Sequence, residues 1–281
     1  MPKTWLITGS SRGFGRELAR AVLENGDNLV ATARRPETLD ALVARYGDRV
    51  RPFALDVTDA VAAVAAVEFA VAEFGSLDVV VNNAGYANSA PIEEMAAGDF
   101  RAQVDANLYG TVNVTKAALP VLRRQRAGTV VQFSSVGGRV GGTPGMGAYQ
   151  TAKFAVEGFS EVLANEVKPF GVKVIIVEPG AFRTDWQGSS MTLHEVGRDY
   201  RETVGALNEY RRATDGTQPG DPARAAKVIV EAVAHPDPPR RLVLGAGAVE
   251  AILESAKARV EETEKWAAVS ISADFPVGSL G

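Results

Sequence analysis

Tyr149 and Lys153 are the residues whose types and spacing are best suited to acid–base chemistry. They lie four positions apart, so on a helix the phenol and the ammonium would stand on one face. A neighbouring ammonium favours the phenolate, and we therefore predict that Lys153 lowers the pKa of Tyr149 from about 10 towards the working pH. Such a phenol can give or take a proton in catalysis.

This pair has meaning only in its context. A Tyr-x-x-x-Lys pair occurs by chance in about one of every two chains of this size. Of the six tyrosines, however, only Tyr149 has a lysine four positions later. Ser134 and Ser135 precede it, and a loop serine could converge with the helical tyrosine.

Composition limits the function classes. The chain has 281 residues, 46% hydrophobic and 23% charged, with a net charge of -4, which predicts a single α/β domain spanning residues 1–281. No basic excess favours nucleic acid. The absence of cysteine and the presence of only two histidines argue against a metal site or a thiolate nucleophile.

No apolar run reaches the ~18 residues of a membrane span, and no room precedes the first strand for a signal peptide. We therefore expect a cytoplasmic protein with no membrane partner.

A glycine-rich loop follows the first predicted strand. The segment Thr4–Thr8 runs into Gly9-Ser10-Ser11-Arg12-Gly13-Phe14-Gly15, and a helix is predicted over Glu17–Glu24. Glycines let the backbone approach a pyrophosphate, and a helix N-terminus offers free N–H groups to it. The plain alternative is a tight turn that needs glycine.

The same loop also spells G-x-S-x-G, the nucleophile turn of serine hydrolases, with Ser11 as nucleophile. A hydrolase needs a histidine base. His235 lies in a proline-rich loop and His194 has no strand ending near it, so we do not favour this interpretation.

Charged residues follow the next two strands, predicted over 28–33 and 50–55. Arg34 stands where NAD-binding chains usually place an acid, and arginine there suits a 2'-phosphate. Arg12 could add a second charge to that phosphate; the alternative is a pair of solvated arginines, Arg34 and Arg35. Asp56 and Val57 could contact an adenine, although Asp56 could equally cap the following loop.

Later strands are predicted over 77–81, 129–133, 173–177 and 242–244. In a doubly wound sheet their carboxyl ends share one crevice. That places Asn82-Asn83-Ala84-Gly85, the two serines and Pro179-Gly180 at the same edge. Asn107 lies within a helix predicted over Phe100–Arg124, where asparagine is unfavourable, which suggests a role beyond packing. Helices are also expected over 59–74, 149–167, 222–234 and 249–266, the last amphipathic with its charges outward.

In these features the chain resembles the short-chain dehydrogenase/reductase family. The resemblance implies a doubly wound Rossmann fold with a seven-stranded parallel sheet and helices on both faces. The matching marks are TGxxxGxG at 8–15, Asp56-Val57, NNAG at 82–85, Asn107, Ser135, Tyr149-x-x-x-Lys153 and Pro179-Gly180. The run Glu178–Thr184 is similar to the retinol and 17β-hydroxysteroid dehydrogenase and bacterial carbonyl reductase branch.

The resemblance implies roles for the catalytic residues. Tyr149 would protonate a carbonyl oxygen, which Ser135 would hydrogen-bond. Lys153 would hold the nicotinamide ribose and lower the tyrosine pKa, and Asn107 would anchor a water that relays protons. Ser135 lies 14 residues before Tyr149, one more than is usual in the family, so Ser134 is kept in reserve.

The resemblance also implies a set of cofactor-binding residues. Thr184 among them would hold the nicotinamide carboxamide. The full set is Gly9, Ser11, Arg12, Gly13, Phe14, Gly15, Arg34, Asp56, Val57, Asn83, Ala84, Gly85, Tyr149, Lys153, Pro179, Gly180 and Thr184.

Two further regions follow, the first assigned by the resemblance and the second by its mildly apolar, patternless sequence. Residues 185–220, with Trp186, Met191, Leu193, His194, Tyr200 and Tyr210, would form a lid over the substrate. The tail 267–281 would pack on a neighbouring subunit or on the lid. Family members often pair as dimers or tetramers through the helices that contain Phe100 and Tyr149.

The favoured function is an NADP(H)-dependent oxidoreductase, with NAD(H) the lesser candidate, acting on the carbonyl/alcohol pair of an apolar or aromatic small-molecule substrate of moderate size. One alternative is a nucleotide-binding sensor without turnover, against which the complete Asn107, Ser135, Tyr149 and Lys153 set argues. Another is an epimerase or dehydratase that retains its cofactor. Such enzymes usually add a larger C-terminal domain, for which this chain is too short.

Overall fold

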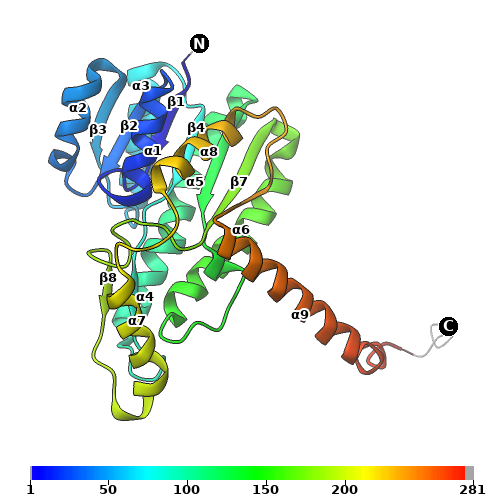
Figure 1. Cartoon of the computed structure of the whole chain (residues 1–281). Coiled ribbons are helices and arrows are strands. Elements are labelled where there is room, and N and C mark those ends of the chain that lie inside the picture. The colour runs from blue at the N-terminus through cyan, green and yellow to red at the C-terminus, as the bar shows by residue number, and fades with distance from the viewer. Residues whose placement is uncertain (1, 276–281) are drawn as a thin grey trace.

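A seven-stranded parallel sheet forms the centre of the molecule, with the order β3-β2-β1-β4-β6-β7-β9 (Figure 1). The computed structural model describes residues 2–275. The strands of this sheet are β1 (Thr4–Ile7), β2 (Asn28–Ala33), β3 (Val50–Ala54), β4 (Val79–Asn82), β6 (Gly128–Phe133), β7 (Val172–Pro179) and β9 (Arg241–Leu244). The helices are α1 (Gly13–Glu24), α2 (Asp40–Tyr46), α3 (Ala60–Phe74), α4 (Ala97–Val104), α5 (Gly110–Gln125), α6 (Gly147–Val167), α7 (Ala206–Thr214), α8 (Pro222–Ala234) and α9 (Ala246–Ile271).

Apolar side chains alternate between two cores, one on each face of the sheet. Trp5 and Ile7 of β1 pack on one face, while Leu6 between them packs on the other. The first face is covered by α1, α2 and α8, and the second by α3, α5 and α6. Because both faces are covered, the strands are buried almost throughout, as parallel strands usually are.

The order in which successive strands are added to the sheet changes sides at β1, although all strands run in parallel. From β1 the sheet extends through β2 to β3 on one side and through β4 to β9 on the other. Ligands of doubly wound sheets bind outside the carboxyl ends of the strands at this point. The predicted fold is thus confirmed, including the number of strands and their parallel direction.

Two predicted helix boundaries were wrong. Helix α1 begins at Gly13 rather than at Glu17, so its N-terminal N–H groups lie inside the glycine loop. The helix expected over Phe100–Arg124 is interrupted by a π-helical turn over Asp105–Tyr109, which separates α4 from α5. Asn107 lies in this turn, and π-helical turns are frequent at functional sites.

The sequence analysis missed a second, small sheet. Strands β5 (Ala87–Ser89) and β8 (Met191–Leu193) pair in parallel beyond the main sheet. Together with α7 they form a layer next to α4, near the lower end of the molecule in Figure 1. Each strand has only three residues, too few to give a periodic signal.

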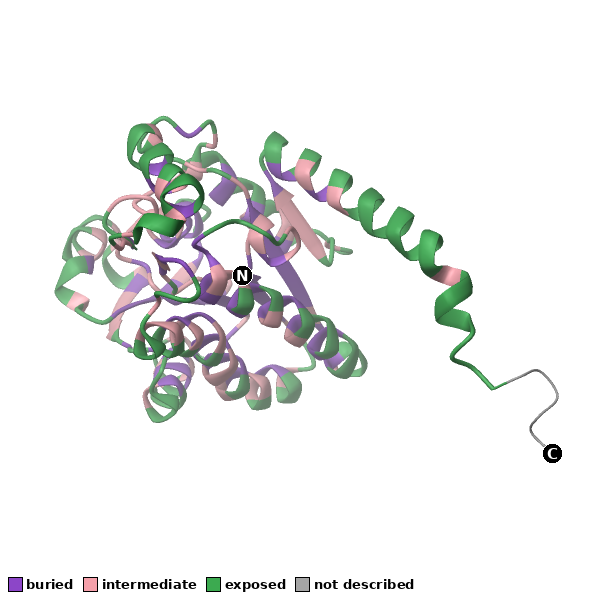
Figure 2. Cartoon of the chain, turned by 90° about the horizontal axis from the view of Figure 1, so that it is seen from below, coloured by how far each residue is buried: buried purple, intermediate pink, exposed green. Residues whose placement is uncertain are grey.

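Helix α9 projects from the body of the molecule (Figure 2). The expected helix is present but longer than predicted, and only Ala248 and Ile252 near its start are buried. The expected amphipathic pattern was wrong in one respect, since Leu253, Val260 and Trp266 are exposed with the charged residues. Residues 267–271 of the expected tail continue the helix, whereas 276–281 lie outside the described residues. No helix of the described chain could cross a membrane.

Candidate active site

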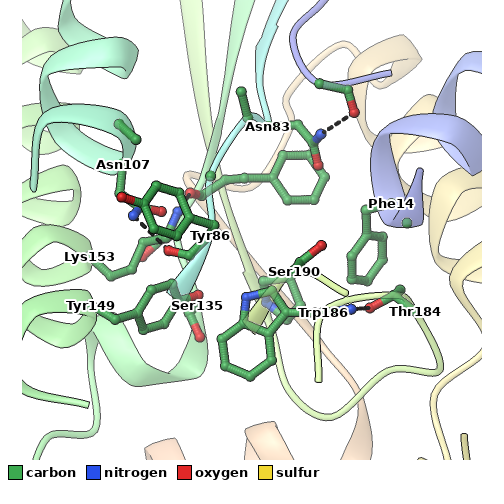
Figure 3. A pocket seen from close by; sticks show the side chains of 18 of the residues that line it. Phe14, Asn83, Tyr86, Asn107, Ser135, Tyr149, Lys153, Thr184, Trp186 and Ser190 are labelled. Carbon is green, nitrogen blue, oxygen red and sulfur yellow. Dashed lines mark hydrogen bonds between the residues drawn. The ribbon is translucent and has the colours of Figure 1, made fainter. Parts of the chain in front are cut away.

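A cavity of about 1310 Å³ opens at the carboxyl ends of the strands (Figure 3). Every predicted catalytic residue lines it, and so does every predicted cofactor residue except Gly15. The cavity extends from Arg34 at the end of β2, past the glycine loop, to Trp186 beyond β7. Residues far apart in the sequence are thus brought to one site because parallel strands deliver them to the same edge.

The glycine loop is held against the end of β4. A Cβ atom at Gly15 would lie only 2.1 Å from the carbonyl oxygen of Gly9, so no larger residue fits there without a shift of the backbone. Gly9 itself has φ of +70°, a conformation that favours glycine. Nδ2 of Asn83 donates to the Thr8 carbonyl at 2.8 Å. Gly15 therefore shapes the cavity although it does not line it.

The lid segment closes on this loop. The backbone N–H of Gly13 donates to Oδ2 of Asp185 at 2.9 Å, and Nη1 of Arg12 donates to the carbonyl and hydroxyl of Ser189 at 3.2 and 3.1 Å. A carboxylate thus lies at the N-terminus of α1, where an anion is stabilised by free N–H groups and by the helix dipole.

The far end of the cavity holds the residues predicted to contact the adenosine. Arg34 is exposed on the cavity wall and makes no ion pair with any residue in 2–275. Oδ1 of Asp56 accepts from the N–H and the hydroxyl of Thr58 at 3.0 and 2.7 Å, and these bonds lower the pKa of Asp56. Asp56 therefore caps the following turn, as the alternative interpretation proposed, and also lines the cavity.

The two serines at the end of β6 point to different partners. Ser135 begins a short 3₁₀ turn, and its Oγ accepts from the N–H of Gly137 at 3.0 Å. The Ser135 hydroxyl also lies beside the phenol of Tyr149 and opposes the rise of its pKa. Ser134 lies instead beside Glu157, and its buried Oγ has no hydrogen-bond partner among the described residues. Of the two candidates, Ser135 is the one beside the tyrosine.

The predicted lowering of the Tyr149 pKa by Lys153 was wrong. Burial raises the pKa of Tyr149 to about 12, against the opposing effect of the Ser135 hydroxyl. Lys153 gives no compensation because its Nζ donates to the Phe133 carbonyl at 2.7 Å and lies 5.6 Å from the centre of the tyrosine ring. Burial also lowers the pKa of Lys153 to about 8, although the nearby Glu157 acts against this shift.

Asn107 presents a free acceptor beside the lysine. Its Nδ2 donates to the Tyr86 and Gln103 carbonyls, both at 2.8 Å, which fixes the orientation of the amide. Its Oδ1 is buried and accepts no hydrogen bond from the described residues. A Cβ atom at Gly85 would lie 2.4 Å from this oxygen and 3.9 Å from Nζ of Lys153, so glycine keeps the space between them open.

Part of the expected lid reaches the site. The ring of Trp186 packs against Tyr149 with centroids 5.3 Å apart, and Met191 and Leu193 join the same apolar cluster. The other predicted aromatic residues do not line the cavity: Tyr210 is 62% exposed and Tyr200 hydrogen-bonds Glu93. The wall also contains polar residues that were not singled out from the sequence, among them Asn88, Thr192, Arg211 and Gln218. No periodic pattern marks them, because Asn88 and Thr192 lie in three-residue strands, Gln218 lies in an irregular segment and Arg211 lies in the short helix α7.

The serine-hydrolase interpretation finds no support in the geometry. Ser11 lines the cavity, but neither His194 nor His235 does. His194 lies 3.6 Å from Asp99, and the ring of His235 contacts the backbone of Asp237. No histidine base is therefore available to Ser11.

A cluster of buried charges lies behind Lys153. Glu178 is fully buried and pairs with Arg139 at 3.3 Å and with Arg241 at 3.1 Å, while Arg241 also contacts Glu157 at 3.1 Å. Burial raises the pKa of Glu178 to about 7, and the neighbouring Glu157 adds to the shift. The cluster joins α6, β7 and β9 directly behind the reactive end of the site.

Comparisons with known proteins agree with this geometry. The family model for short chain dehydrogenase matches residues 3–193. Oxidoreductase BOA17 of Botryotinia fuckeliana is 49% identical, over 97% of this chain and 99% of its own length. A short-chain dehydrogenase structure from Streptomyces avermitilis is 40% identical with a TM-score of 0.92, covering 98% of this chain and 100% of that one.

Several structural relatives contain a bound nucleotide, NADP in some and NAD in another. An alcohol dehydrogenase from the archaeon Thermococcus sibiricus, solved with 5-hydroxy-NADP, is 26% identical with a TM-score of 0.71, covering 87% of this chain and 96% of that one. The matched family region includes every residue of the catalytic set. The chain is an oxidoreductase of the short-chain dehydrogenase/reductase family.

Proposed function

We propose that this protein is an NADP(H)-dependent oxidoreductase that interconverts a carbonyl and a secondary alcohol on an apolar or aromatic substrate of moderate size. The observation that carries this proposal is the arrangement of Ser135, Tyr149, Lys153 and Asn107 around one cavity. Trp186 and Met146 line the substrate end of that cavity and give it its apolar character.

The residues present fit a dinucleotide. Gly9, Gly13 and Gly15 would hold the pyrophosphate near the N-terminus of α1, and the small residues 83–85 would form the floor. Arg34 and Arg12 would bind the 2'-phosphate as charge-assisted donors, while Asp56 and Val57 would contact the adenine. Thr184, Pro179 and Gly180 would hold the nicotinamide end. When bound, the nicotinamide supplies or accepts the hydride.

The side chains of this protein account for the proton and the charge. Burial keeps Tyr149 protonated, so its hydroxyl can donate a proton to a carbonyl oxygen during reduction. Ser135 would hydrogen-bond the same oxygen as negative charge develops on it. Lys153 would stabilise the resulting phenolate, and the free Oδ1 of Asn107 would accept the next hydrogen bond of a proton path to solvent.

The proposal extends to the whole chain. Residues 1–281 would act as one domain, with 185–220 as the substrate lid. We also propose a homodimer or homotetramer. Large apolar residues exposed on the π-helical turn and on α6 support this assembly, among them Tyr109 and Val162, at 55% and 58% exposure.

Cofactor titration followed by turnover tests the proposal. NADPH and NADH are titrated separately by nicotinamide fluorescence, and the protein is then screened with ketones, aldehydes and secondary alcohols. We expect NADPH to bind at least about tenfold more tightly, a difference of roughly 1.4 kcal/mol, and carbonyl reduction to consume it. Failure of both nucleotides to bind would contradict the proposal.

A further inference from the structure

Arg211 of α7 is a buried arginine on the wall of the active-site cavity. Its residue surface is only 6% exposed, yet it lines the same cavity as Tyr149. It belongs to the layer formed by α7, β5 and β8, which the sequence analysis did not identify. Arginines are rarely buried to this extent unless a carboxylate pairs with them.

Arg211 has only neutral partners among residues 2–275. Its Nη1 donates to Oγ of Ser89 at 3.0 Å and to Oδ1 of Asn208 at 2.9 Å. Its Nε and Nη2 donate to no described residue, and no described carboxylate lies within 4.0 Å. Burial lowers the pKa of Arg211, and no neighbouring charge opposes this shift.

A second arginine cluster, whose arginines are only partly buried, shows the contrast. Arg139 and Arg241 both pair with the buried Glu178. A buried charge without such a partner is costly, and the cost is recovered when a counter-ion arrives. The guanidinium presents five N–H donors in a planar fork that matches a carboxylate.

We propose that Arg211 binds a carboxylate of the substrate, so that the natural substrate is an oxo acid or hydroxy acid. This inference rests on the proposed function, because it assigns the substrate class of the same site. The acid would lie with its carboxylate against Arg211 and its carbonyl at Tyr149. The single charge of Arg211 fits a monoanion, while the other arginines of the wall, Arg12 and Arg34, lie at the nucleotide end.

The cavity wall between these two points supports the assignment. Trp186 and Met146 offer apolar contact for the body of the substrate, and Asn88 and Thr192 add neutral polar groups near the β5–β8 pair. An amphiphilic substrate with one charged end and one reactive carbonyl matches this distribution. A cationic substrate would be repelled by Arg211.

The unmodified protein gives the first test. Straight-chain oxo acids in which the ketone lies three to ten carbons from the carboxylate are compared with their methyl esters, at saturating NADPH. We expect at least one acid to exceed its ester about 30-fold or more in kcat/KM, mostly through KM. Equal efficiency for every acid and ester would overturn the assignment while leaving the proposed function intact. Absence of any turnover together with absence of NADPH binding would instead overturn the proposed function.

Substitution of the arginine gives the second test. Arg211→Gln should remove the preference for the acid, so that the acid-to-ester ratio of kcat/KM falls to about 1, while Arg211→Lys should retain part of this preference because the charge remains. Arg212→Gln, at the exposed neighbouring position on α7, is the matched control and should keep the full preference. NADPH titration of each variant verifies that the site is folded. If Arg211→Gln retained the wild-type acid-to-ester ratio, Arg211 would be a structural link between α7 and β5 rather than a binding residue.

Discussion

Burial sets the protonation of the two central residues of the site. Tyr149 and Lys153 are both less than 10% exposed, and burial favours the uncharged form of each side chain. The pKa of Tyr149 rises to about 12 and the pKa of Lys153 falls to about 8. The tyrosine is thus prepared to donate a proton rather than to accept one. Keeping Lys153 charged costs desolvation free energy, and groups with such shifted pKa values are typical of functional sites.

We predict that Lys153→Met abolishes activity and yet stabilises the folded protein at pH 7. Below pH 8 the native state must keep a buried ammonium whose pKa is about 8, against an ordinary 10.5. The substitution removes the desolvation cost of the buried ammonium, and the lost hydrogen bond to the Phe133 carbonyl offsets part of this effect. The free energy of unfolding should rise by about 2 kcal/mol.

The stability gain of the variant stays nearly constant until the pH reaches the range in which Lys153 titrates. As the pH rises from 8 to 10.5 the native state releases the proton and the unfolded chain keeps it, so wild-type stability recovers and the gain of the variant shrinks. Urea denaturation at pH 7 and pH 10 measures this, with Lys116→Met on the exposed face of α5 as the control. A variant less stable than wild type at pH 7 would contradict the argument.

We predict that Arg34→Asp shifts cofactor preference towards NADH. Loss of the guanidinium removes the partner of the 2'-phosphate, and the new carboxylate repels that phosphate but can accept from a 2'-hydroxyl. The ratio of the NADH and NADPH dissociation constants should change by about 100-fold. Arg35→Asp serves as the control, because Arg35 does not line the cavity; an equal shift in both variants would move the phosphate contact away from Arg34.

At the scale of single residues, the motifs in the sequence predicted which side chains meet. Strand ends and helical spacing were enough to bring Ser135 and Tyr149 together, whereas Asn107 was assigned to the site by the family resemblance. Neither the raised pKa of Tyr149 nor the unpaired state of Arg211 could be predicted, since both depend on desolvation by residues distant in the sequence.

The segment after Thr184 joins the lid to the nucleotide site. Asp185 accepts from the N–H of Gly13 at 2.9 Å and lies 3.9 Å from Arg16. A pyrophosphate bound at the start of α1 would compete for the same N–H group and would meet the negative charge of Asp185. We therefore expect the position of the segment after Thr184 and nucleotide binding to be linked through this carboxylate.

We predict that Asp185→Asn tightens NADPH binding by about threefold to tenfold, because the competing charge is removed. The free protein should lose about 0.5 kcal/mol of stability, as expected when an acid leaves a helix N-terminus. Nicotinamide fluorescence and thermal denaturation measure the two effects. Asp199→Asn, an exposed site in the same region, should change neither; weaker NADPH binding by Asp185→Asn would show that the carboxylate assists the nucleotide.

Long elements were predictable and short ones were not. The buried runs of β4 and β6, and Asp59 at the N-cap of α3, follow from apolar runs and capping preferences. Strands β5 and β8 are too short for such signals. They form because Ala87 and Met191 are buried against Tyr149 and Met146, a tertiary effect absent from the local sequence.

At the scale of the whole molecule, α9 contacts the described body of the chain only near its start and through Arg259, which donates to the Arg139 carbonyl at 2.8 Å. The helix has 26 residues, and its outer two thirds carry exposed apolar side chains, including Val260 at 55% and Trp266 at 54%. Helices gain most of their stability from packing of an apolar face. A second copy of this chain would supply that packing, in agreement with the proposed homo-oligomer.

We predict that the double variant Val260→Glu and Trp266→Glu reduces the oligomer to smaller species. Charges placed at a buried apolar contact oppose association by several kcal/mol. Light scattering coupled to size exclusion should show at least a halving of the mass at micromolar concentration. The double variant Glu261→Gln and Glu264→Gln on the same helix should keep the wild-type mass. If the first double variant kept the wild-type mass, the interface would lie elsewhere. A wild-type mass of about 29.7 kDa would show that the protein is a monomer.

The reduction rate of Tyr149→Phe tests the central claim most directly. NADPH consumption is followed with the best carbonyl substrate from the screen, and NADPH affinity is measured on the same preparation. The substitution removes one hydroxyl and leaves the ring packed on Trp186, so we expect the rate to fall about 1000-fold with the NADPH dissociation constant within about threefold of wild type. A variant that retained turnover within about tenfold of wild type would show that Tyr149 is not the proton donor.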